Sequence, residues 1–344
     1  MSKKITTSVG GQALIEGILM RGPKGAAMSV RLPNGEIETT PKEVKPLKDK
    51  YKILGYPFLR GIVSFIESMV FGYSCLMESA EKSGLDDDEE NMSKVDKWIN
   101  EKFGDHIMTF IGVISAVLGV ALAIGLFFYL PVYLVDMFDK YVTGNTLSSW
   151  HPLFEGIIRI IIFIAYVAIV SLMKDIKRVF MYHGAEHKTI FCYENGEELT
   201  VENVKKYTRF HPRCGTSFIF VMLIIGILLS TVLIMIFPTL GDVRWLWTII
   251  KLLLLPVIMG IGYEFIKYAG RTENLFTKIV SAPGLWMQRL TTKEPTDDII
   301  EVGIAALKAV IENQDNEVND NDDIEQLQEI TLNEEPEQKD DISQ

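Results

Sequence analysis

The chain has 344 residues, of which 48% are hydrophobic and 23% are charged, and its formal net charge is −11. This length admits one or two soluble domains or a membrane protein, and the acidic balance gives no reason to expect a nucleic-acid partner. Three cysteines, an odd number, do not indicate a disulfide framework. The order of apolar and charged segments along the chain therefore decides the class of protein.

The N-terminal segment, residues 1–54, lacks the period of a helix. Apolar and polar residues alternate on both sides of Pro33-Asn34-Gly35, which predicts a β-hairpin because asparagine and glycine tolerate positive φ. The preceding stretch, GGQALIEGILMRGP, is rich in glycine. Such density predicts turns or close approach of two backbones.

The next segment, residues 55–80, predicts an amphipathic helix at the membrane surface. It is long enough to span a bilayer, but it contains Arg60 and Glu67, and its apolar residues recur at helical spacing. A span here would also place the basic segment 174–215 outside the cytoplasm. Residues 81–106, which include the run DDDEE, predict an acidic linker.

Four long apolar segments follow and predict membrane-spanning helices. The first carries no charged residue and exceeds the roughly 20 residues that cross a bilayer. The four predicted spans are residues 107–135, 157–173, 216–237 and 245–263. Two histidines border the first two spans, His106 and His151, and we expect both to lie at the interface without partners.

Basic residues orient the four predicted spans. Fifteen lysines and arginines precede Ile107 and eight lie within 174–215, whereas Lys140 and Arg244 alone occupy the two other loops. Basic loops stay in the cytoplasm by the positive-inside rule. We therefore expect a multi-pass protein of the cell membrane with both termini in the cytoplasm.

The remaining segments predict cytoplasmic helices and a tail. Thr200 is placed to cap a short helix that ends at Tyr207. Residues 264–313 predict two short helices broken at Pro283-Gly284, then a helix from Asp297 capped by Thr296 or Asp297 itself. That last helix carries an apolar stripe of Ile300, Ile304, Leu307 and Ile311. Residues 314–344 are strongly acidic and predict a disordered tail.

Together these segments predict a mainly α, integral membrane fold. It comprises four transmembrane helices and a cytoplasmic layer that contains the N-terminal β-hairpin and the amphipathic helices. The segment at 174–215 belongs to that layer and holds the candidate metal-binding and catalytic residues.

That segment contains YHGAEHKTI, in which His183, Glu186 and His187 have the spacing H-x-x-E-H of some zinc hydrolases. On a helix the two histidines lie one turn apart on one face, where they can bind a single cation. Glu186 reaches the same face and is a candidate general base. The alternative is a polar helix end, with Glu186 in a surface ion pair beside Lys188.

Two imidazoles do not complete a zinc site, and the same segment offers His211 and Cys214 in HPRCGT. One of them added to the pair gives three ligands and an open position, as in catalytic sites, whereas both give a closed structural site. Glu16 and Glu264 are further candidates for the missing ligand.

The stretches GGQALIEGILMRGP, YHGAEHKTIFCYENG, FHPRCGTSF and SAPGLWMQRLTTKEP resemble the YqhQ-like family of bacterial integral membrane proteins. The resemblance covers about residues 8–307 and implies a bacterial cell membrane and metal-dependent chemistry. The residues that it implies belong to the characteristic motifs are Gln12, Glu16, Arg21, His183, Glu186, His187, His211, Arg213 and Cys214.

The leading functional hypothesis is a metal-dependent membrane enzyme, a hydrolase at the cytoplasmic face. His183 and His187 would bind Zn²⁺ with His211 or Cys214, and Glu186 would take a proton from the water that the metal activates. Arg213 or Arg21 would stabilise an anionic transition state. Membrane lipids, or a membrane protein brought by the helix at 55–80, are the expected substrates or partners.

The alternative is a non-catalytic membrane regulator or scaffold, in which the histidine cluster is structural and another membrane protein binds. Transport is a weaker third hypothesis, because Lys251 alone does not make an ion pathway. The sequence does not indicate the oligomeric state.

Overall fold

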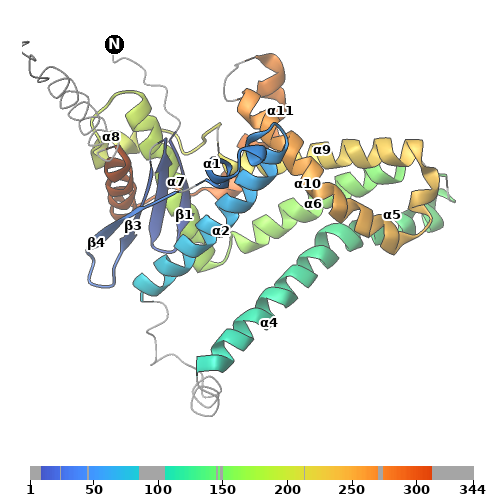
Figure 1. Cartoon of the computed structure of the whole chain (residues 1–344), viewed down its shortest axis with the longest axis horizontal. Helices are drawn as coiled ribbons and strands as arrows, with labels where there is room; N and C mark the ends of the chain where they lie inside the picture. Colours follow the sequence, from blue (N-terminus) through green and yellow to red (C-terminus); the bar gives the residue numbers. More distant parts are fainter. Residues whose placement is uncertain are drawn as a thin grey trace, which may run out of the picture.

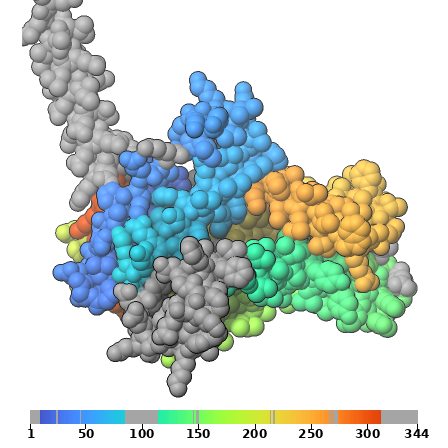
Figure 2. Space-filling model, turned by 60° about the horizontal axis from the view of Figure 1, so that its bottom comes forward, coloured from blue at the N-terminus to red at the C-terminus, as the bar shows by residue number. Residues whose placement is uncertain are grey.

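A computed structural model describes residues 9–23, 25–44, 46–84, 105–144, 146–147, 150–212, 214–269 and 274–311. These residues form two parts (Figure 1). One part, here called the layer, is a β-sheet with α-helices on both faces. The other, here called the bundle, consists of long apolar helices. The two parts occupy opposite ends of the molecule, as the space-filling view also shows (Figure 2).

The sheet has four antiparallel strands in chain order. They are β1 (Gly10–Leu14), β2 (Gly17–Gly22), β3 (Gly25–Arg31) and β4 (Ile37–Lys42). The hairpin predicted around Asn34-Gly35 is confirmed as the β3–β4 turn, where Gly35 has φ 89°. The prediction of a single hairpin was incomplete, because the glycine-rich stretch forms two further strands, β1 and β2. A Cβ on Gly11 would lie 2.7 Å from Leu19 O of β2, so glycine permits this close approach.

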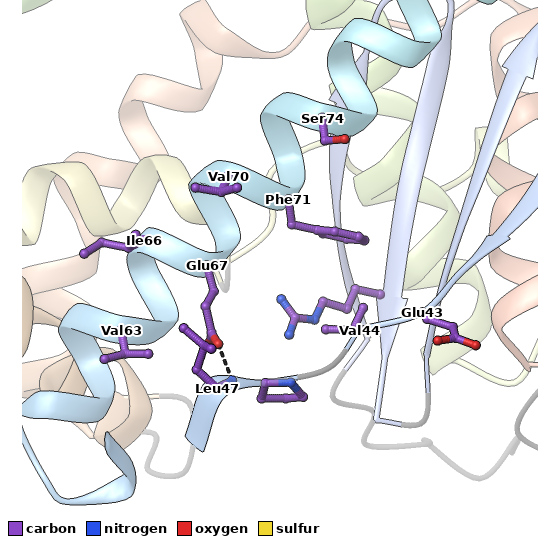
Figure 3. A pocket seen from close by; sticks show the side chains of 11 residues that line it. Glu43, Val44, Leu47, Val63, Ile66, Glu67, Val70, Phe71 and Ser74 are labelled. Carbon is purple, nitrogen blue, oxygen red and sulfur yellow. Dashed lines mark hydrogen bonds between the residues drawn. The ribbon is translucent and has the colours of Figure 1, made fainter. Parts of the chain in front are cut away.

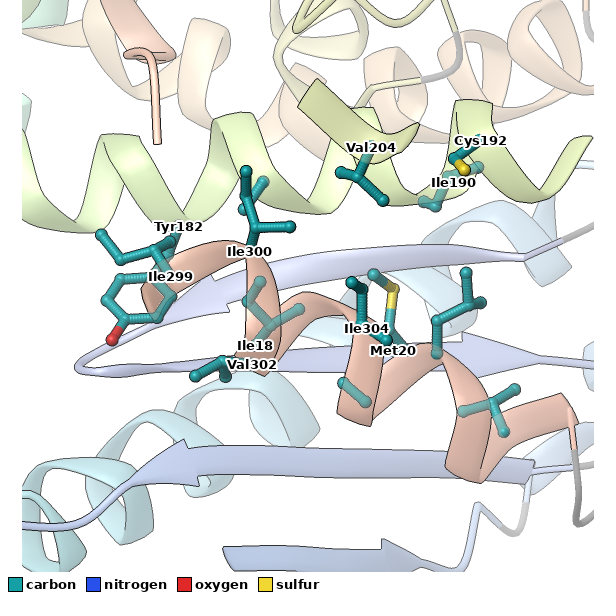
Figure 4. Close-up of a cluster of buried hydrophobic side chains, with 14 of the residues drawn as sticks. Ile18, Met20, Tyr182, Ile190, Cys192, Val204, Ile299, Ile300, Val302 and Ile304 are labelled. Atoms are coloured by element: carbon teal, nitrogen blue, oxygen red, sulfur yellow. The ribbon is translucent and has the colours of Figure 1, made fainter. Parts of the chain in front are cut away.

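Both faces of the sheet are apolar and covered. Ile18 and Met20 of β2 belong to a core with α7 (Lys174–Glu194) and the helix at 297–311 (Figure 4). Leu19, between them, belongs to a second core with Cys75 of α2 (Leu59–Lys82). Successive side chains of a strand point to opposite faces, so this alternation places α2 and α7 on opposite sides of the sheet.

The helix at 297–311 confirms the predicted stripe. Ile300 and Leu307 are fully buried, and the Ile300 N–H donates to Thr296 O at 3.1 Å at the helix start. Arg31 of β3 fixes the helix to the sheet, donating to Asp298 O at 2.5 Å and to Glu301 at 2.8 Å.

The bundle is formed by four segments. The first runs from α4 (Asp105–Ile124) through the π-helical η2 (Gly125–Tyr129), α5 (Leu130–Phe138) and η3 (Asp139–Thr143). The others are α6 (His151–Val170), α9 (Gly215–Ile236) and α10 (Arg244–Ala269). α4 diverges from the rest (Figure 1).

Within the described residues, five helices are long and apolar enough to cross a membrane, one more than the four predicted spans. The additional one is α2, whose mean hydropathy of 1.2 is below the 1.9 to 3.1 of the others.

Charged residues inside the bundle correct two expectations. α6 begins at His151, before the predicted 157, so it includes Glu155. Glu155 bonds Lys251 of α10 at 2.7 Å and accepts from Trp247 Nε1 at 3.2 Å, so Lys251 is not alone. His151 was expected without a partner, yet its Nε2 lies 2.7 Å from Asp139 Oδ2. The side chain of His106 lies outside the described residues.

The remaining helices belong to the layer, to the bundle or to the region where they meet. They are α1 (Leu47–Lys50), η1 (Lys52–Gly55), α8 (Val201–Lys205), η5 (Pro238–Gly241) and α11 (Leu275–Thr291). Thr200 caps α8 as predicted, accepting from Asn203 N at 3.3 Å. The predicted break at Pro283 is wrong, because α11 continues through it, and Met287 of α11 is buried in a cluster with Val167 and Phe220. Tertiary packing here outweighs the helix-breaking tendency of proline.

Two further predictions fall largely outside the described residues. The acidic tail at 314–344 is one. The other is the linker at 81–106, of which the structure describes only the end of α2, a turn at 83–84 and the start of α4.

Candidate metal centre

The H-x-x-E-H motif lies on α7, so its predicted helical geometry is confirmed. Glu186 and His187 are 5% and 1% exposed, deep between the sheet and the segment that follows α11. Gly184 permits that crossing, since a Cβ there would lie 2.1 Å from Lys293 O. Lys293 N in turn donates to Phe180 O at 2.8 Å. The glycine that weakens the helix by propensity is thus required by packing.

Three potential metal ligands converge at this point. His183, His187 and Cys214 each offer one ligand atom, and these atoms all lie within 4.8 Å of one another. His183 Nε2 and Cys214 Sγ are 3.1 Å apart. Cys214 directly precedes α9 and lines the same cavity as the two histidines, together with Gly215 and Ile219 of that helix.

Backbone carbonyls orient both imidazole rings. His183 Nδ1 lies 2.9 Å from Thr291 O, and His187 Nδ1 lies 2.5 Å from Arg209 O. A carbonyl only accepts, so each Nδ1 carries the proton and each Nε2 is left with its lone pair. His187 Nε2 is buried and makes no aligned hydrogen bond. In metal sites, a histidine that binds the ion through one ring nitrogen usually donates the N–H of the other to a carbonyl or carboxylate, which fixes the orientation of the ring.

The electrostatic environment keeps His187 neutral. Burial lowers its pKa, and the nearby Cys214 thiol and the Arg209 carbonyl oppose that shift only in part. A neutral imidazole is the form that binds a metal ion.

Glu186 lines the same cavity as the three ligand residues, and one of its carboxylate oxygens also lacks a hydrogen bond. Its Oε2 is buried and makes no hydrogen bond. Burial raises the pKa of Glu186 to about 6, against the opposing effects of His183 and of the Gly11 N–H. A carboxyl group that titrates near neutrality in a cavity is suited to general acid–base chemistry.

These groups line a cavity of about 380 Å³. One wall is β1, where a Cβ on Gly11 would lie 3.0 Å from Glu186 Cδ. The opposite wall is α7, and the end is closed by four residues at and before the start of α9: His211, Cys214, Gly215 and Ile219. The glycine-rich stretch and the histidine motif, far apart in sequence, therefore form one site.

His211 lines the same cavity but is not one of the three converging ligands. Its ring lies 5.5 Å from the His187 ring and 4.5 Å from the Phe191 ring, measured between centroids. Gln288 of α11 holds the His211 backbone with two hydrogen bonds: the His211 N–H donates to Gln288 Oε1 at 2.7 Å, and Gln288 Nε2 donates to His211 O at 2.8 Å. Arg213 lies outside the described residues.

The carboxylates considered as a missing ligand bind elsewhere. Glu16, in the β1–β2 turn with φ 50°, accepts from Arg178 at 2.6 Å and from Tyr182 OH at 3.1 Å. Glu264 accepts from Arg60 of α2 at 2.6 Å. Each of these carboxylates is engaged by its own arginine, so neither completes a shell around the histidines.

Lys188 was considered as an ion-pair partner of Glu186, and Arg21 as a group that stabilises the transition state, but the structure places both elsewhere. Lys188 pairs with Glu294, so it is not the surface partner of Glu186. Arg21 lines a different groove, on the α2 side of the sheet.

Sequence reasoning missed the groups that support the histidines. Thr291, Arg209 and Gln288 act through backbone or amide contacts, which no spacing rule identifies. A signal was nevertheless present, because Gln288 and Thr291 lie in SAPGLWMQRLTTKEP, one of the stretches that carried the family resemblance.

Comparison with known proteins agrees with that resemblance. Residues 56–313 match the family described as "Protein of unknown function (DUF1385)". The chain is 34% identical over 316 residues to "Uncharacterized protein YqhQ" of Bacillus subtilis (strain 168), covering 90% of this chain and 95% of that protein. No solved structure matches the chain. The chain therefore belongs to the YqhQ-like DUF1385 family.

Proposed function

We propose that this protein is a metal-dependent hydrolase of the bacterial cell membrane, with Zn²⁺ held by His183, His187 and Cys214. The observation that carries the proposal is the convergence of these three ligand atoms within 4.8 Å. Nitrogen and thiolate donors favour zinc, and three protein ligands are the set found in catalytic zinc sites. The incomplete hydrogen bonding of His187 Nε2 fits this role.

The chemistry proposed for the site divides between the ion and Glu186. A zinc ion supplies Lewis acidity toward the bond that is cleaved. Glu186 takes the proton from the attacking water and returns it to the leaving group, a role that suits its pKa of about 6. Arg213, which the HPRC motif places beside Cys214 in the sequence, would stabilise negative charge on the substrate. The cavity of about 380 Å³ admits one ester, phosphate ester or peptide group with its neighbouring atoms.

We further propose that the layer faces the cytoplasm and that α2 lies at the membrane surface, leaving four spanning segments. The buried side of α2, with Gly72, Cys75 and Ser79, packs on the sheet and so is part of the layer. Its lower hydropathy also favours a surface position. Labelling of single cysteines introduced at exposed positions, such as Tyr73 of α2, with a membrane-impermeant maleimide tests this topology.

Metal content of the purified chain is the first test of the function. We expect one zinc ion per chain, lost in Cys214→Ala and in His187→Ala. Cys75→Ala is the matched control, because Cys75 of α2 is buried against the opposite face of the sheet, so its replacement should leave the zinc content unchanged. Purified protein without stoichiometric transition metal would contradict the proposal.

Glu186→Gln separates an enzyme from a scaffold. We expect this variant to keep zinc and the fold but to lose hydrolysis of a panel of ester, phosphodiester and peptide substrates by about 10²-fold or more. A chain that keeps its cellular phenotype with Glu186→Gln would instead be a membrane regulator whose histidine cluster is structural.

A further inference from the structure

A second cavity, of about 490 Å³, lies on the other side of the sheet, between α2 and the segment that leads from β4 into α1. Apolar side chains form most of its walls, among them Val63, Val70 and Phe71 of α2, with Leu47 opposite (Figure 3). We call it the α2 groove. The sheet separates it from the cavity of the candidate metal centre.

The α2 groove contains a cation that makes no direct contact with a carboxylate of the described residues. Arg21 ends β2 and lines the groove, whereas its neighbour Met20 lies in the core on the α7 side. Among the residues that the structure describes, none forms a hydrogen bond or an ion pair with Arg21. A half-buried guanidinium in an apolar groove is favourable for an anion, because its donors have no protein acceptor.

A carboxylate faces the same space. Glu67 of α2 lines the α2 groove, and its Oε1 accepts from Leu47 N at 2.5 Å (Figure 3). Its second oxygen has no hydrogen bond to a described residue, and it forms no ion pair with Arg21. The α2 groove therefore presents one guanidinium, Arg21, and the carboxylates of Glu67 and Glu43. Glu43 has an interaction of its own, whereas Glu67 keeps one oxygen without a hydrogen bond to a described residue.

The position of the α2 groove points to a membrane component. Arg60, at the start of α2, bonds Glu264 near the end of α10, a helix apolar enough to span. At 1.5 Å per residue, the part of α2 that lines the groove lies roughly 5–20 Å along the helix axis from Arg60. Ile66 and Val70, which line the groove, are 53% and 66% exposed.

We propose that the α2 groove binds one phosphatidylethanolamine molecule. Arg21 donates to the phosphodiester, the primary ammonium donates to Glu67, and an acyl chain lies along Val63 and Ile66 toward the end of α10. This occupant matches all three features of the groove: the free cation, the free carboxylate oxygen and the apolar walls that lead back to the bundle.

Native mass spectrometry of the delipidated full-length chain tests the proposal. The probes are phosphatidylethanolamine, phosphatidylglycerol, phosphatidylcholine and the chain-free glycerophosphoethanolamine, each at the same concentrations. We expect one phosphatidylethanolamine to bind roughly tenfold more tightly than the other two lipids, since each lacks an ammonium that can donate to Glu67. Glycerophosphoethanolamine should not bind measurably, because it lacks the apolar part.

Three variants locate the lipid. Arg21→Gln should weaken phosphatidylethanolamine binding roughly tenfold, whereas Lys50→Gln, which removes an exposed charge beside the α2 groove, should change it less than about twofold. Glu67→Gln keeps the bond to Leu47 and should abolish the preference for phosphatidylethanolamine. Ser74→Trp, at an exposed position of the groove, should block all three lipids.

Thermal unfolding measures whether each variant is folded. If Arg21→Gln does not fold, Ser74→Trp still tests whether the lipid binds in the α2 groove. Unchanged phosphatidylethanolamine binding by both Arg21→Gln and Ser74→Trp overturns the proposal. Equal binding of the three lipids by the wild type also overturns it. Tight binding of glycerophosphoethanolamine would make the α2 groove a site for soluble phosphate esters and would equally refute a lipid occupant.

Discussion

The bundle and the layer both bury charged or polar side chains, but they differ in whether each buried group has a hydrogen-bond partner. In the bundle, Glu155 and Lys251 have side chains 4% and 3% exposed and bond each other at 2.7 Å. In the layer, Glu186 and His187 are buried to a similar extent, yet each keeps one polar atom without an aligned hydrogen bond, and both line one cavity. A buried polar group without a partner costs about 1–3 kcal/mol. A paired charge therefore indicates structure, whereas unpartnered groups around a cavity indicate a site that a ligand completes.

The largest expected effect comes from breaking the pair in the bundle. Lys251→Met leaves the Glu155 carboxylate buried, and among the described residues the Trp247 N–H is its remaining hydrogen-bond donor. We expect the free energy of unfolding to fall by about 3–5 kcal/mol, measured by denaturation in detergent micelles. The double variant Glu155→Gln/Lys251→Met should recover most of the loss, since it removes both charges. A loss below about 1 kcal/mol in the single variant would show that the pair does not stabilise the bundle.

A smaller effect is expected where the layer depends on close packing. Gly184→Ala places a Cβ at 2.1 Å from Lys293 O, so α7 and the chain after α11 must separate. We expect a loss of about 1–3 kcal/mol in unfolding free energy. Gly25→Ala is the matched control, because a Cβ on Gly25 meets no atom within 4 Å. Equal stabilities of the two variants would argue against the tight crossing.

Glu186→Gln should stabilise the metal-free protein in a pH-dependent way. The pKa of Glu186 is raised from 4.5 to about 6 on folding. Between these values the folded state binds more protons than the unfolded state, so wild-type stability falls as pH rises through this window. Above pH 6 we expect the variant to gain about 2 kcal/mol over the wild type, and below pH 4.5 almost nothing. Chemical denaturation with a chelator, repeated at pH 4 and pH 8, measures the difference, and a gain at pH 4 alone would have the wrong sign.

The smallest effect is expected for an ion pair near the surface of the layer. Glu78 of α2 contacts Lys42 of β4 and Lys82, and the hydrogen bond from Lys42 is the main cause of its lowered pKa. A lowered pKa gives stability above the unfolded value of 4.5 that is lost as pH falls through the folded value. Glu78→Gln should cost less than about 1 kcal/mol at pH 7 and nothing in acid. A cost comparable to that of Lys251→Met would remove the distinction between the exposed and the buried pair.

Local patterns predicted the elements well where the pattern and the packing agree. The H-x-x-E-H helix, the β3–β4 hairpin, the Thr200 cap and the stripe around Ile300 all rest on periodicity or on one residue's backbone preference. The predictions failed where packing outweighed preference. The glycine-rich stretch indicated turns or a close approach of two backbones, and the close approach is confirmed at Gly11, where Leu19 of β2 and Glu186 leave no room for a Cβ. That the same stretch forms the strands β1 and β2 was not predicted. Pro283 indicated a break, but α11 runs through it.

The candidate site, too, was predicted in part by local spacing and in part decided by packing. Spacing identified His183, Glu186 and His187, since residues three and four apart share one helix face. It did not decide between His211 and Cys214, which differ by only three positions in the chain. In the structure the Cys214 sulfur lies with the two histidines, while the backbone of His211 is held by Gln288, 77 residues away.

The sequence by itself determined which segments are apolar, which helices are amphipathic and which residues carry metal-binding chemistry, because these are properties of short windows. Only the tertiary structure decided that the sheet lies between α2 and α7. It thereby placed Arg21 in the α2 groove and Glu186 in the metal-centre cavity, on opposite faces. The partners of the buried charges were also decided there, as with Glu155 and Lys251, which are 96 residues apart. The physical reason is that these contacts depend on how distant elements fill the same volume, which no local pattern encodes.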